Sequence, residues 1–219
     1  MAQKNFKNYL LEMLTIVFSI TLSFMLNEWR ENAQNEAKQV RYLRHFEENL
    51  SEDSLKIYQE INDLKDVARA SDSIIEYSIG GREVDSLDFF IQTQPVYSTI
   101  PINDLAYKEL TQTGESGLIK NRNLLKDLIS YYDIHFWEIK EYSAIDRKVV
   151  LERLLPFYEE NLGGADSIQN RSIIRSLRFI NLIGYNKNFK SRQIALLQKQ
   201  LERIGVLQSQ IRQELRRLD

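Results

Sequence analysis

The feature that most constrains this chain is one long apolar run near its N-terminus. Residues 9–26 read YLLEMLTIVFSITLSFML and carry a single charge, that of Glu12. Such a run is typical of a helix that spans a bilayer, because eighteen helical residues cover roughly 27 Å of a hydrocarbon core about 30 Å thick. Trp29 follows the run, and tryptophan favours the membrane interface. The sequence therefore predicts a transmembrane anchor over residues 9–29, preceded by a short basic tail over residues 1–8.

A signal peptide and a soluble core helix both fit the apolar run less well than an anchor does. A secretory signal peptide has a shorter apolar core that ends in a small-x-small cleavage site, and residues 24–29, FMLNEW, offer none. A core helix of a soluble domain is apolar on one face, whereas this run is apolar nearly all round and has charged flanks. We therefore expect an uncleaved single-pass anchor, with residues 30–219 forming one domain outside the bilayer.

The orientation of the anchor follows less directly from the charges. Lys4 and Lys7 precede the run, and four basic residues follow it: Arg30, Lys38, Arg41 and Arg44. The count of Lys and Arg alone favours a cytoplasmic C-terminal side, but long domains translocate largely regardless of charge. The short basic tail next to the run favours the opposite orientation. The chain has no cysteine, which is compatible with either compartment. We expect residues 30–219 to be periplasmic or external.

One face of the apolar run carries polar side chains, here called the membrane stripe. Its members are spaced by 3, 4 and 4 residues, so they share one helical face: Glu12, Thr15, Ser19 and Ser23. Small polar residues let helices approach closely in lipid, and a carboxylate within an apolar run indicates a partner or a function. The alternatives are that Glu12 reaches the headgroups while the hydroxyls bond to their own helix, or that the stripe lines a proton or ion path.

The rest of the sequence predicts a mainly α fold, an antiparallel helical bundle that continues the membrane helix. With only 8 Gly and 3 Pro in 219 residues, the composition favours helices over strands. Over residues 27–70 four apolar residues recur every seven positions: Leu43, Leu50, Ile57 and Leu64. This pattern predicts an amphipathic helix that extends the anchor as a stalk. The acidic residues between them are expected to form a solvated face: Glu47, Glu48, Glu52 and Asp53.

Breaks in the pattern divide the remaining chain. Gly80-Gly81, Pro95 and Pro101 predict a long irregular loop over residues 71–103, within which residues 85–100 could instead hold a short strand. A second helical region is expected over residues 118–162, kinked or ended by Pro156. A third helix is expected over residues 166–183, opened by Asp166 and closed near Gly184.

The last segment, residues 188–218, has the clearest heptad repeat, which we call the coiled-coil seam. One seam position holds Ile194, Leu201, Gln208 and Leu215, and the other holds Leu197, Ile204, Ile211 and Leu218. A single polar residue in such a seam, here Gln208, can fix the register. The seam belongs either to an ordinary bundle helix packed on the stalk or to a coiled coil between subunits.

Two stretches of the sequence share a pattern of motifs. The first has a Glu at the start of the span and a characteristic exit and helix: Glu12, then Asn27 to Glu31, then Tyr42, Leu43 and Asp53. The second is a mid-chain motif: Tyr107, Leu110, Gly114, Leu118, Ile119, Asn121, Leu124 and Tyr132. Together they cover about a third of the chain, which resembles a widespread, uncharacterised family of small bacterial single-span membrane proteins. The resemblance implies a bacterial inner membrane and no particular activity.

Four residues of the mid-chain motif are expected to meet at one place, here called the motif corner: Tyr107, Gly114, Asn121 and Tyr132. Glycine ends helices readily and asparagine caps them, so Gly114 is expected to end one helix and Asn121 to begin the next. The two tyrosines then either pack as part of the core or line a ligand pocket.

The sequence offers little that would support catalysis. The chain lacks cysteine, a nucleotide-binding glycine loop and a G-x-S-x-G elbow, and its two histidines, His45 and His135, are isolated. We therefore expect no enzyme, no cofactor and no metal site. A net charge of −2 argues against nucleic acid as a partner. The expected partners are the lipid bilayer and either further copies of the chain or another membrane protein. We expect an interaction or scaffold component, or alternatively an extracytoplasmic ligand-sensing bundle that acts through a membrane partner.

Overall fold

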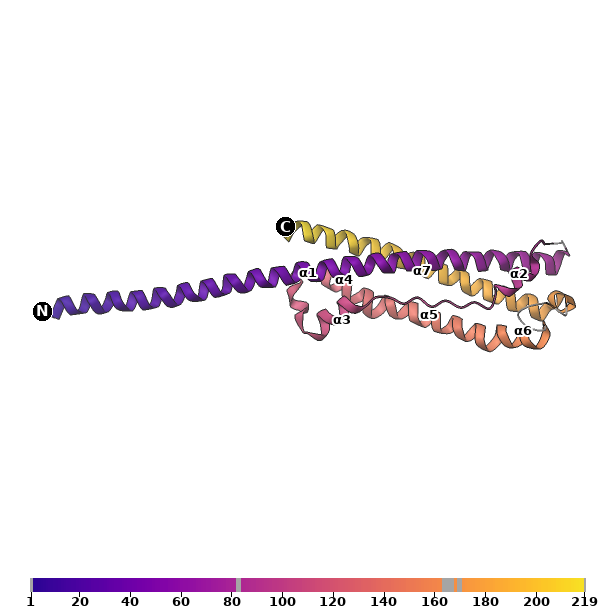
Figure 1. The fold of residues 1–219 in the computed structure, drawn as a ribbon, viewed down its shortest axis with the longest axis horizontal. Helices are drawn as coiled ribbons and strands as arrows, with labels where there is room; N and C mark the ends of the chain where they lie inside the picture. Colours follow the sequence, from indigo (N-terminus) through magenta and orange to yellow (C-terminus); the bar gives the residue numbers. More distant parts are fainter. Residues whose placement is uncertain (1, 82–83, 163–167, 169–170, 219) are drawn as a thin grey trace.

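The protein is described by a computed structural model that covers residues 2–81, 84–162, 168 and 171–218. These residues fold into helices, with no β-strand among them, so the predicted mainly α class is confirmed. The molecule is elongated because one helix, α1 (Ala2–Gly80), runs along its whole length (Figure 1). With 79 residues, α1 is about 120 Å long.

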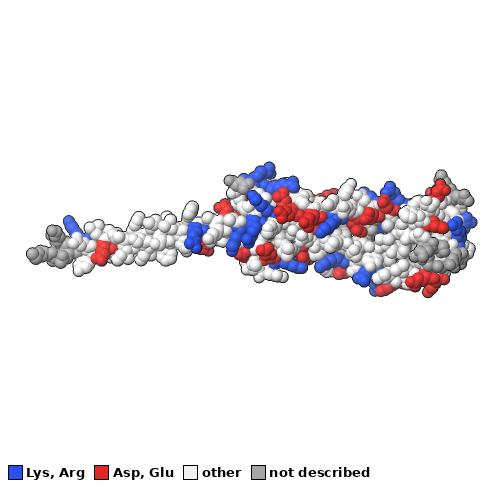
Figure 2. Space-filling view, viewed as in Figure 1, with Lys and Arg blue, Asp and Glu red and all other residues white. Residues whose placement is uncertain are grey.

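The first part of α1 projects from the rest of the protein. Every described side chain from residue 6 to residue 34 is exposed, and Gln39 is the first buried one. Within the described residues α1 is the one helix long and apolar enough to cross a membrane, and none of its apolar window is buried inside the chain. Figure 2 shows this part as a rod nearly free of charged side chains, with charges gathered where it meets the bundle.

The second part of α1 is the central helix of the bundle. The predicted stripe of Leu43, Leu50, Ile57 and Leu64 is buried. The helix continues ten residues beyond residue 70, so the prediction of an irregular loop over residues 71–103 was wrong at its start. Ser71, Ile74 and Ser78 continue the buried stripe, and both hydroxyls bond to carbonyls of their own helix, which leaves no polar group to break it.

The remainder of the predicted loop is partly helical as well. A short helix, α2 (Leu87–Gln92), follows the end of α1, and residues 96–104 have no regular secondary structure. This segment runs back along the bundle, as the thin trace between α2 and α3 in Figure 1 shows. It therefore returns the chain to the end of the bundle that faces the projecting helix.

A second helical column begins at that end. Helix α3 (Leu105–Gln112) and the 3₁₀ turn η1 (Glu115–Leu118) precede it. The column consists of α4 (Arg122–Ser130), a π-helical turn η2 (Tyr131–His135), α5 (Phe136–Val149), a second π-helical turn η3 (Val150–Leu154) and α6 (Leu155–Asn161). Pro156 does not end the column, because the wide π-helical turn before it accommodates the proline ring.

The chain returns through one long helix. A 3₁₀ turn, η4 (Arg171–Arg175), leads into α7 (Leu177–Leu218), which has 42 residues. The prediction of a separate helix ending near Gly184 was wrong. A glycine inside a helix costs only about 1 kcal/mol, which the burial of Phe179 and Ile183 before it and of Leu197 after it outweighs. Asp166, the expected start of that helix, lies outside the described residues.

Helix α7 runs antiparallel to α1, and the column from α4 to α6 runs parallel to α1 because residues 96–104 have already carried the chain back (Figure 1). The most extensive contact of α7 is with α1. Its buried stripe also has a heptad spacing: Gln193, Leu197, Gln200, Ile204, Leu207, Ile211 and Glu214.

The coiled-coil seam therefore lies inside the chain, with one of its two positions displaced. Leu197, Ile204 and Ile211 are buried as the seam requires, and Leu218 packs at its edge. The other position is one residue earlier than predicted, so Ile194, Leu201, Gln208 and Leu215 flank the contact and are partly exposed. The buried position holds three polar residues, Gln193, Gln200 and Glu214. A pattern of apolar residues alone therefore does not reveal it. Gln208 donates to the Ser51 hydroxyl of α1 (2.9 Å).

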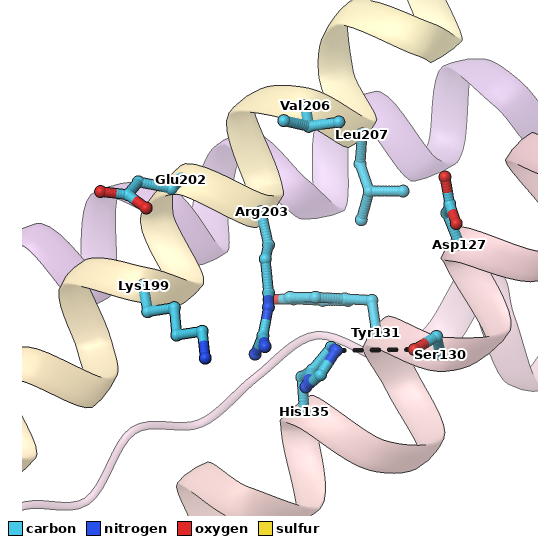
Figure 3. A pocket seen from close by; sticks show the side chains of 9 residues that line it. All are labelled: Asp127, Ser130, Tyr131, His135, Lys199, Glu202, Arg203, Val206 and Leu207. Carbon is cyan, nitrogen blue, oxygen red and sulfur yellow. Dashed lines mark hydrogen bonds between the residues drawn. The ribbon is translucent and has the colours of Figure 1, made fainter.

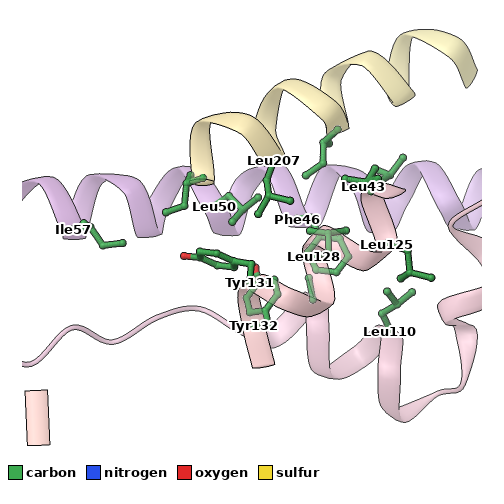
Figure 4. Close-up of a cluster of buried hydrophobic side chains, with 14 of the residues drawn as sticks. Leu43, Phe46, Leu50, Ile57, Leu110, Leu125, Leu128, Tyr131, Tyr132 and Leu207 are labelled. Carbon is green, nitrogen blue, oxygen red and sulfur yellow. The ribbon is translucent and has the colours of Figure 1, made fainter. Parts of the chain in front are cut away.

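The core consists of two apolar clusters. The cluster nearer the projecting helix joins α1, α3, α4, η2 and α7, and Figure 4 shows Phe46, Leu50, Leu128, Tyr131 and Leu207 within it. The second cluster lies at the far end of the bundle around Ile74, Phe157 and Phe179. Between the clusters α1 buries Val67, Ala70 and Ser71, and the facing segments contribute buried polar side chains: Gln94, Asp146, Asn186 and Lys190.

Candidate functional site

The hydroxyls of the membrane stripe bond to their own helix. Each donates at 2.8 Å to the carbonyl four residues earlier: Thr15 to Leu11, Ser19 to Thr15 and Ser23 to Ser19. Thr21, on the opposite face, does the same with Val17. Satisfied in this way, the hydroxyls can enter lipid without a partner, and the stripe offers a partner helix a smooth surface of small side chains. The stripe is exposed along its full length within this chain.

The residues of the motif corner form two local arrangements, one at the helix ends and one between the two tyrosines. Gly114 has φ 73°, a left-handed conformation that glycine adopts without strain. The Asn121 side chain accepts from the Leu124 backbone N–H (3.2 Å) and caps α4. The rings of Tyr107 and Tyr132 stack with centroids 4.8 Å apart and an angle of 10° between their planes. The Asn121 amide also donates to the Glu214 carboxylate (3.2 Å), so the corner ties α4 to α7.

A buried carboxylate lies beside the tyrosines. Asp53 is fully buried, which corrects its assignment to a solvated acidic face, and one of its oxygens accepts from the Asn103 backbone N–H (2.9 Å). Its other oxygen and the hydroxyls of Tyr131 and Tyr132 have no hydrogen-bond partner among the described residues. Burial raises the pKa of Asp53 to about 6, although the Asn103 hydrogen bond opposes the shift. Burial and the charge of Asp53 raise the pKa of both phenols, so they remain protonated.

A fully buried ion pair fixes the segment that runs along the bundle. The Lys190 ammonium contacts both oxygens of Asp146 (2.6 and 2.7 Å), and both side chains are 0% exposed. Ser98 donates its backbone N–H to Asp146 (2.7 Å), and Lys190 donates to the Val96 carbonyl (2.8 Å). The pair therefore joins α5, α7 and residues 96–98. Burial lowers the pKa of Lys190, and it raises the pKa of the half-buried Glu60 nearby.

The first π-helical turn creates a polar relay. In a π-helix residues five apart share a face, so Ser130 and His135 meet, with the hydroxyl 3.5 Å from the imidazole Nε2. The other imidazole nitrogen of His135 lies 3.2 Å from a carboxylate oxygen of Glu138. His135 is thus not isolated, which corrects the prediction from the sequence.

The relay has the order of a Ser-His-acid triad but not its surroundings. A triad that cleaves esters needs free N–H groups beside the nucleophile to stabilise an oxyanion. Ser130 is followed by a continuous run of helical residues to Asn161, whose backbone N–H groups are used in helix hydrogen bonds. The relay instead fixes the carboxylate of Glu138, which also accepts from Gln200 (3.3 Å) and Arg203 (3.5 Å) on α7. Burial raises the pKa of Glu138, but the hydrogen bond from His135 and the charges of His135 and Arg203 outweigh it, so the net shift is downward.

A cleft of about 350 Å³, the α4–α7 cleft, lies beside this relay. Figure 3 shows its walls: Ser130 and His135 on one side, Lys199 and Arg203 on the other, with Tyr131 and Leu207 between them. The nitrogen atoms of Lys199, Arg203 and His135 gather at one end of the cleft, and the Asp127 carboxylate lies at the other (Figure 3). Glu202, beside Lys199 on α7, also lines the cleft (Figure 3). The cleft thus joins an apolar floor to an end with two basic side chains and one carboxylate, which we call the cationic end after Lys199 and Arg203.

The sequence analysis missed the buried polar residues and the cleft, while the membrane stripe stays a prediction. The signal for the buried residues was present in the register. Asp53 lies four residues before Ile57 and three after Leu50, Lys190 lies seven residues after Ile183, and Asp146 lies seven after Ile139. Each charged residue therefore occupies an apolar position of its helix. The cleft has no such signal, because it depends on the π-helical turn.

Comparison of the chain with family models, with curated proteins and with solved structures found no match. The function is therefore inferred from the residues described above.

Proposed function

We propose that this protein is a membrane-anchored, non-catalytic interaction or scaffold component of a bacterial inner membrane, with its helical bundle on the periplasmic or external side. One observation carries the proposal. The apolar residues 9–26 are uncovered by the rest of the chain, yet they belong to the same uninterrupted helix that forms the centre of the bundle.

Because α1 is continuous, it connects the membrane span rigidly to the bundle. Between the end of the apolar run and the first buried residue, α1 crosses residues 27–38 as a single exposed helix rich in charged and amide side chains. These twelve residues span about 18 Å. A helix that is polar all round is suited to bridging through solvent. The bundle is therefore held at a set distance from the bilayer surface, and the orientation of the membrane helix is transmitted to it directly.

The membrane stripe supports a second helix as the partner within the bilayer. Its hydroxyls are satisfied by their own helix and its side chains are small, which permits close packing in lipid. The partner is either a second copy of this chain or another membrane protein. The apolar run offers no other face with this combination of small side chains and a carboxylate, since Glu12 is its one charged residue.

Crosslinking tests this interface. The double substitution Ser19→Leu and Ser23→Leu places two bulky side chains on the stripe and should abolish most of the crosslinked product formed by the full chain in membranes. Thr21→Leu is the matched control, because Thr21 has the same back-bonded hydroxyl but lies on the opposite face. Equal crosslinking of the double variant and the wild type would refute the stripe as the interface.

The α4–α7 cleft favours a second candidate function, an extracytoplasmic ligand-sensing bundle that acts through a membrane partner. One wall of the cleft belongs to α7, which packs along α1, and α1 enters the membrane. A ligand that shifts α7 therefore acts on the helix that carries the span. A ligand-dependent change in the crosslinking of the span is the test of this function, and unchanged crosslinking at saturating ligand argues against it.

A further inference from the structure

The cationic end of the α4–α7 cleft has charged groups that the fold does not use. Lys199 has no ion-pair or hydrogen-bond partner among the described residues. Arg203 uses one terminal nitrogen, Nη1, for Gln200 (3.2 Å) and Glu138 (3.5 Å), and the edge formed by its other nitrogens is not engaged by the described part of the chain. This edge has the geometry that binds a carboxylate through two parallel hydrogen bonds.

The guanidinium is held in place before any ligand arrives. Glu138 and Gln200 fix one side of Arg203, and the relay from Ser130 through His135 fixes Glu138 in turn. A side chain held in this way loses little conformational entropy when it binds a ligand. This arrangement distinguishes Arg203 from the exposed arginines elsewhere on α7, such as Arg216, which has no partner among the described residues.

The floor of the cleft is apolar. The buried Tyr131 ring and Leu207 lie between the cationic end and Asp127, and Val206 adds an exposed apolar side chain at the wall. Ligand sites generally combine an apolar lining with a few fixed polar groups, and a volume of about 350 Å³ lies at the lower end of their size range. The cleft therefore suits a small molecule with an apolar body and one anionic group.

We propose that the α4–α7 cleft binds a small organic carboxylate, whose anionic group lies against Arg203 and Lys199 and whose apolar body lies on Tyr131 and Leu207. The inference rests on the second proposed function, ligand sensing, and names its ligand class. A planar carboxylate matches the single free edge of Arg203, whereas a phosphate would gain little from the apolar floor. Glu138 holds Nη1 of Arg203 in place, but its negative charge opposes the binding of an anion at the same guanidinium, and a glutamine there would keep the accepting oxygen without the charge.

Benzoate is the probe, and benzamide is its uncharged isostere. For a dissociation constant on the order of 1 mM, about 20 mM benzoate should raise the melting temperature of the full chain in detergent by about 4 °C. Benzamide, sodium chloride and sodium phosphate at matched ionic strength should give no comparable rise. Equal stabilisation by benzamide or by phosphate, or none by benzoate, would overturn the assignment.

Single substitutions test whether Arg203 and Lys199 bind the carboxylate. Arg203→Gln and Lys199→Gln should each weaken benzoate binding about tenfold, the usual effect of losing one charge-assisted hydrogen bond, while Arg216→Gln on the same helix should leave it unchanged. Each shift is taken relative to the variant's own melting temperature without ligand. Glu138→Gln should strengthen binding, an outcome that a purely structural Arg203 cannot produce. Full benzoate stabilisation in both Arg203→Gln and Lys199→Gln contradicts the proposal. Crosslinking of the span does not enter this measurement, so failure here is separate from failure of the membrane interface.

Discussion

Removing either member of the buried Asp146–Lys190 pair should destabilise the bundle by about 3–5 kcal/mol. The substitutions are Lys190→Met and Asp146→Asn, which keep the approximate size of each side chain. Both groups are 0% exposed, and the pair carries two further bonds, one from the Ser98 N–H and one to the Val96 carbonyl. Lys190→Met leaves the Asp146 carboxylate with the Ser98 N–H alone, and Asp146→Asn leaves the Lys190 ammonium without the opposite charge that it contacts.

The cost of burying Lys190 without a partner sets the size of the loss in unfolding free energy. Without Asp146, the Lys190 amine must lose its proton to remain buried. Holding an amine with an ordinary pKa of 10.5 uncharged at pH 7 costs about 5 kcal/mol, which is an upper limit because the site can relax. In the double variant Asp146→Asn, Lys190→Met no charge is buried, the asparagine oxygen can still accept from the Ser98 N–H, and the remaining cost is that of the unpaired Val96 carbonyl at about 1–3 kcal/mol. The double variant should therefore lose at least about 2 kcal/mol less than the sum of the single variants.

Denaturant unfolding of the full chain in a nonionic detergent, followed by circular dichroism at pH 7, measures these values. Lys148→Met is the matched control, because Lys148 forms an exposed pair with Glu152 (3.9 Å) and its loss should change the unfolding free energy by no more than about 0.5 kcal/mol. If Lys190→Met and Asp146→Asn each behave like this control, the buried pair does not fix residues 96–98 as described.

Two further predictions concern stability. Folding raises the pKa of Asp53 from 3.8 to about 6, so the folded chain binds the carboxyl proton more tightly than the unfolded chain does. The stability that this proton contributes is therefore fully present below pH 3.8 and is lost as the pH rises through 6. Asp53→Asn should accordingly stabilise the bundle by about 1–3 kcal/mol at pH 7.5 and have no effect at pH 3.5, and a pH-independent effect in the same unfolding assay would contradict this. Gly114→Ala should cost about 1–2 kcal/mol, because φ is 73° there, whereas Gly205→Ala inside α7 should gain about 0.5–1 kcal/mol. Neither added Cβ meets an atom within 4 Å, so equal effects of the two glycine substitutions would show that backbone conformation does not decide them.

The sequence predicts the helices of this protein well where a single periodic pattern runs uninterrupted. The stripe from Leu43 to Leu64 is buried as its spacing requires. Gly114 and Asn121 adopt the expected left-handed and capping roles, because both roles depend only on residues a few positions away. Features that depend only on neighbouring residues, such as helix caps, can therefore be predicted from the sequence alone.

The failures arise where the tertiary structure outweighs a local signal. Gly184 is expected to end a helix, but burial of Phe179 and Ile183 before it and of Leu197 after it keeps α7 intact. The second seam position was assigned one residue late, because Gln193, Gln200 and Glu214 occupy buried positions. The α4–α7 cleft could not be predicted, since the π-helical turn that brings Ser130 to His135 has no signature in the sequence.

Accessibility of single cysteines to a membrane-impermeant maleimide tests the central claim most directly, and the absence of cysteine from the chain makes each variant unambiguous. Three exposed positions suffice: Lys7→Cys before the span, Val17→Cys within it and Gln213→Cys near the end of α7. In intact cells Gln213→Cys should be labelled, Lys7→Cys should be labelled only after permeabilisation, and Val17→Cys should be labelled only after the membrane is dissolved. Labelling of Val17→Cys in intact membranes contradicts a membrane span, and labelling of Gln213→Cys only after permeabilisation contradicts a bundle outside the cytoplasm.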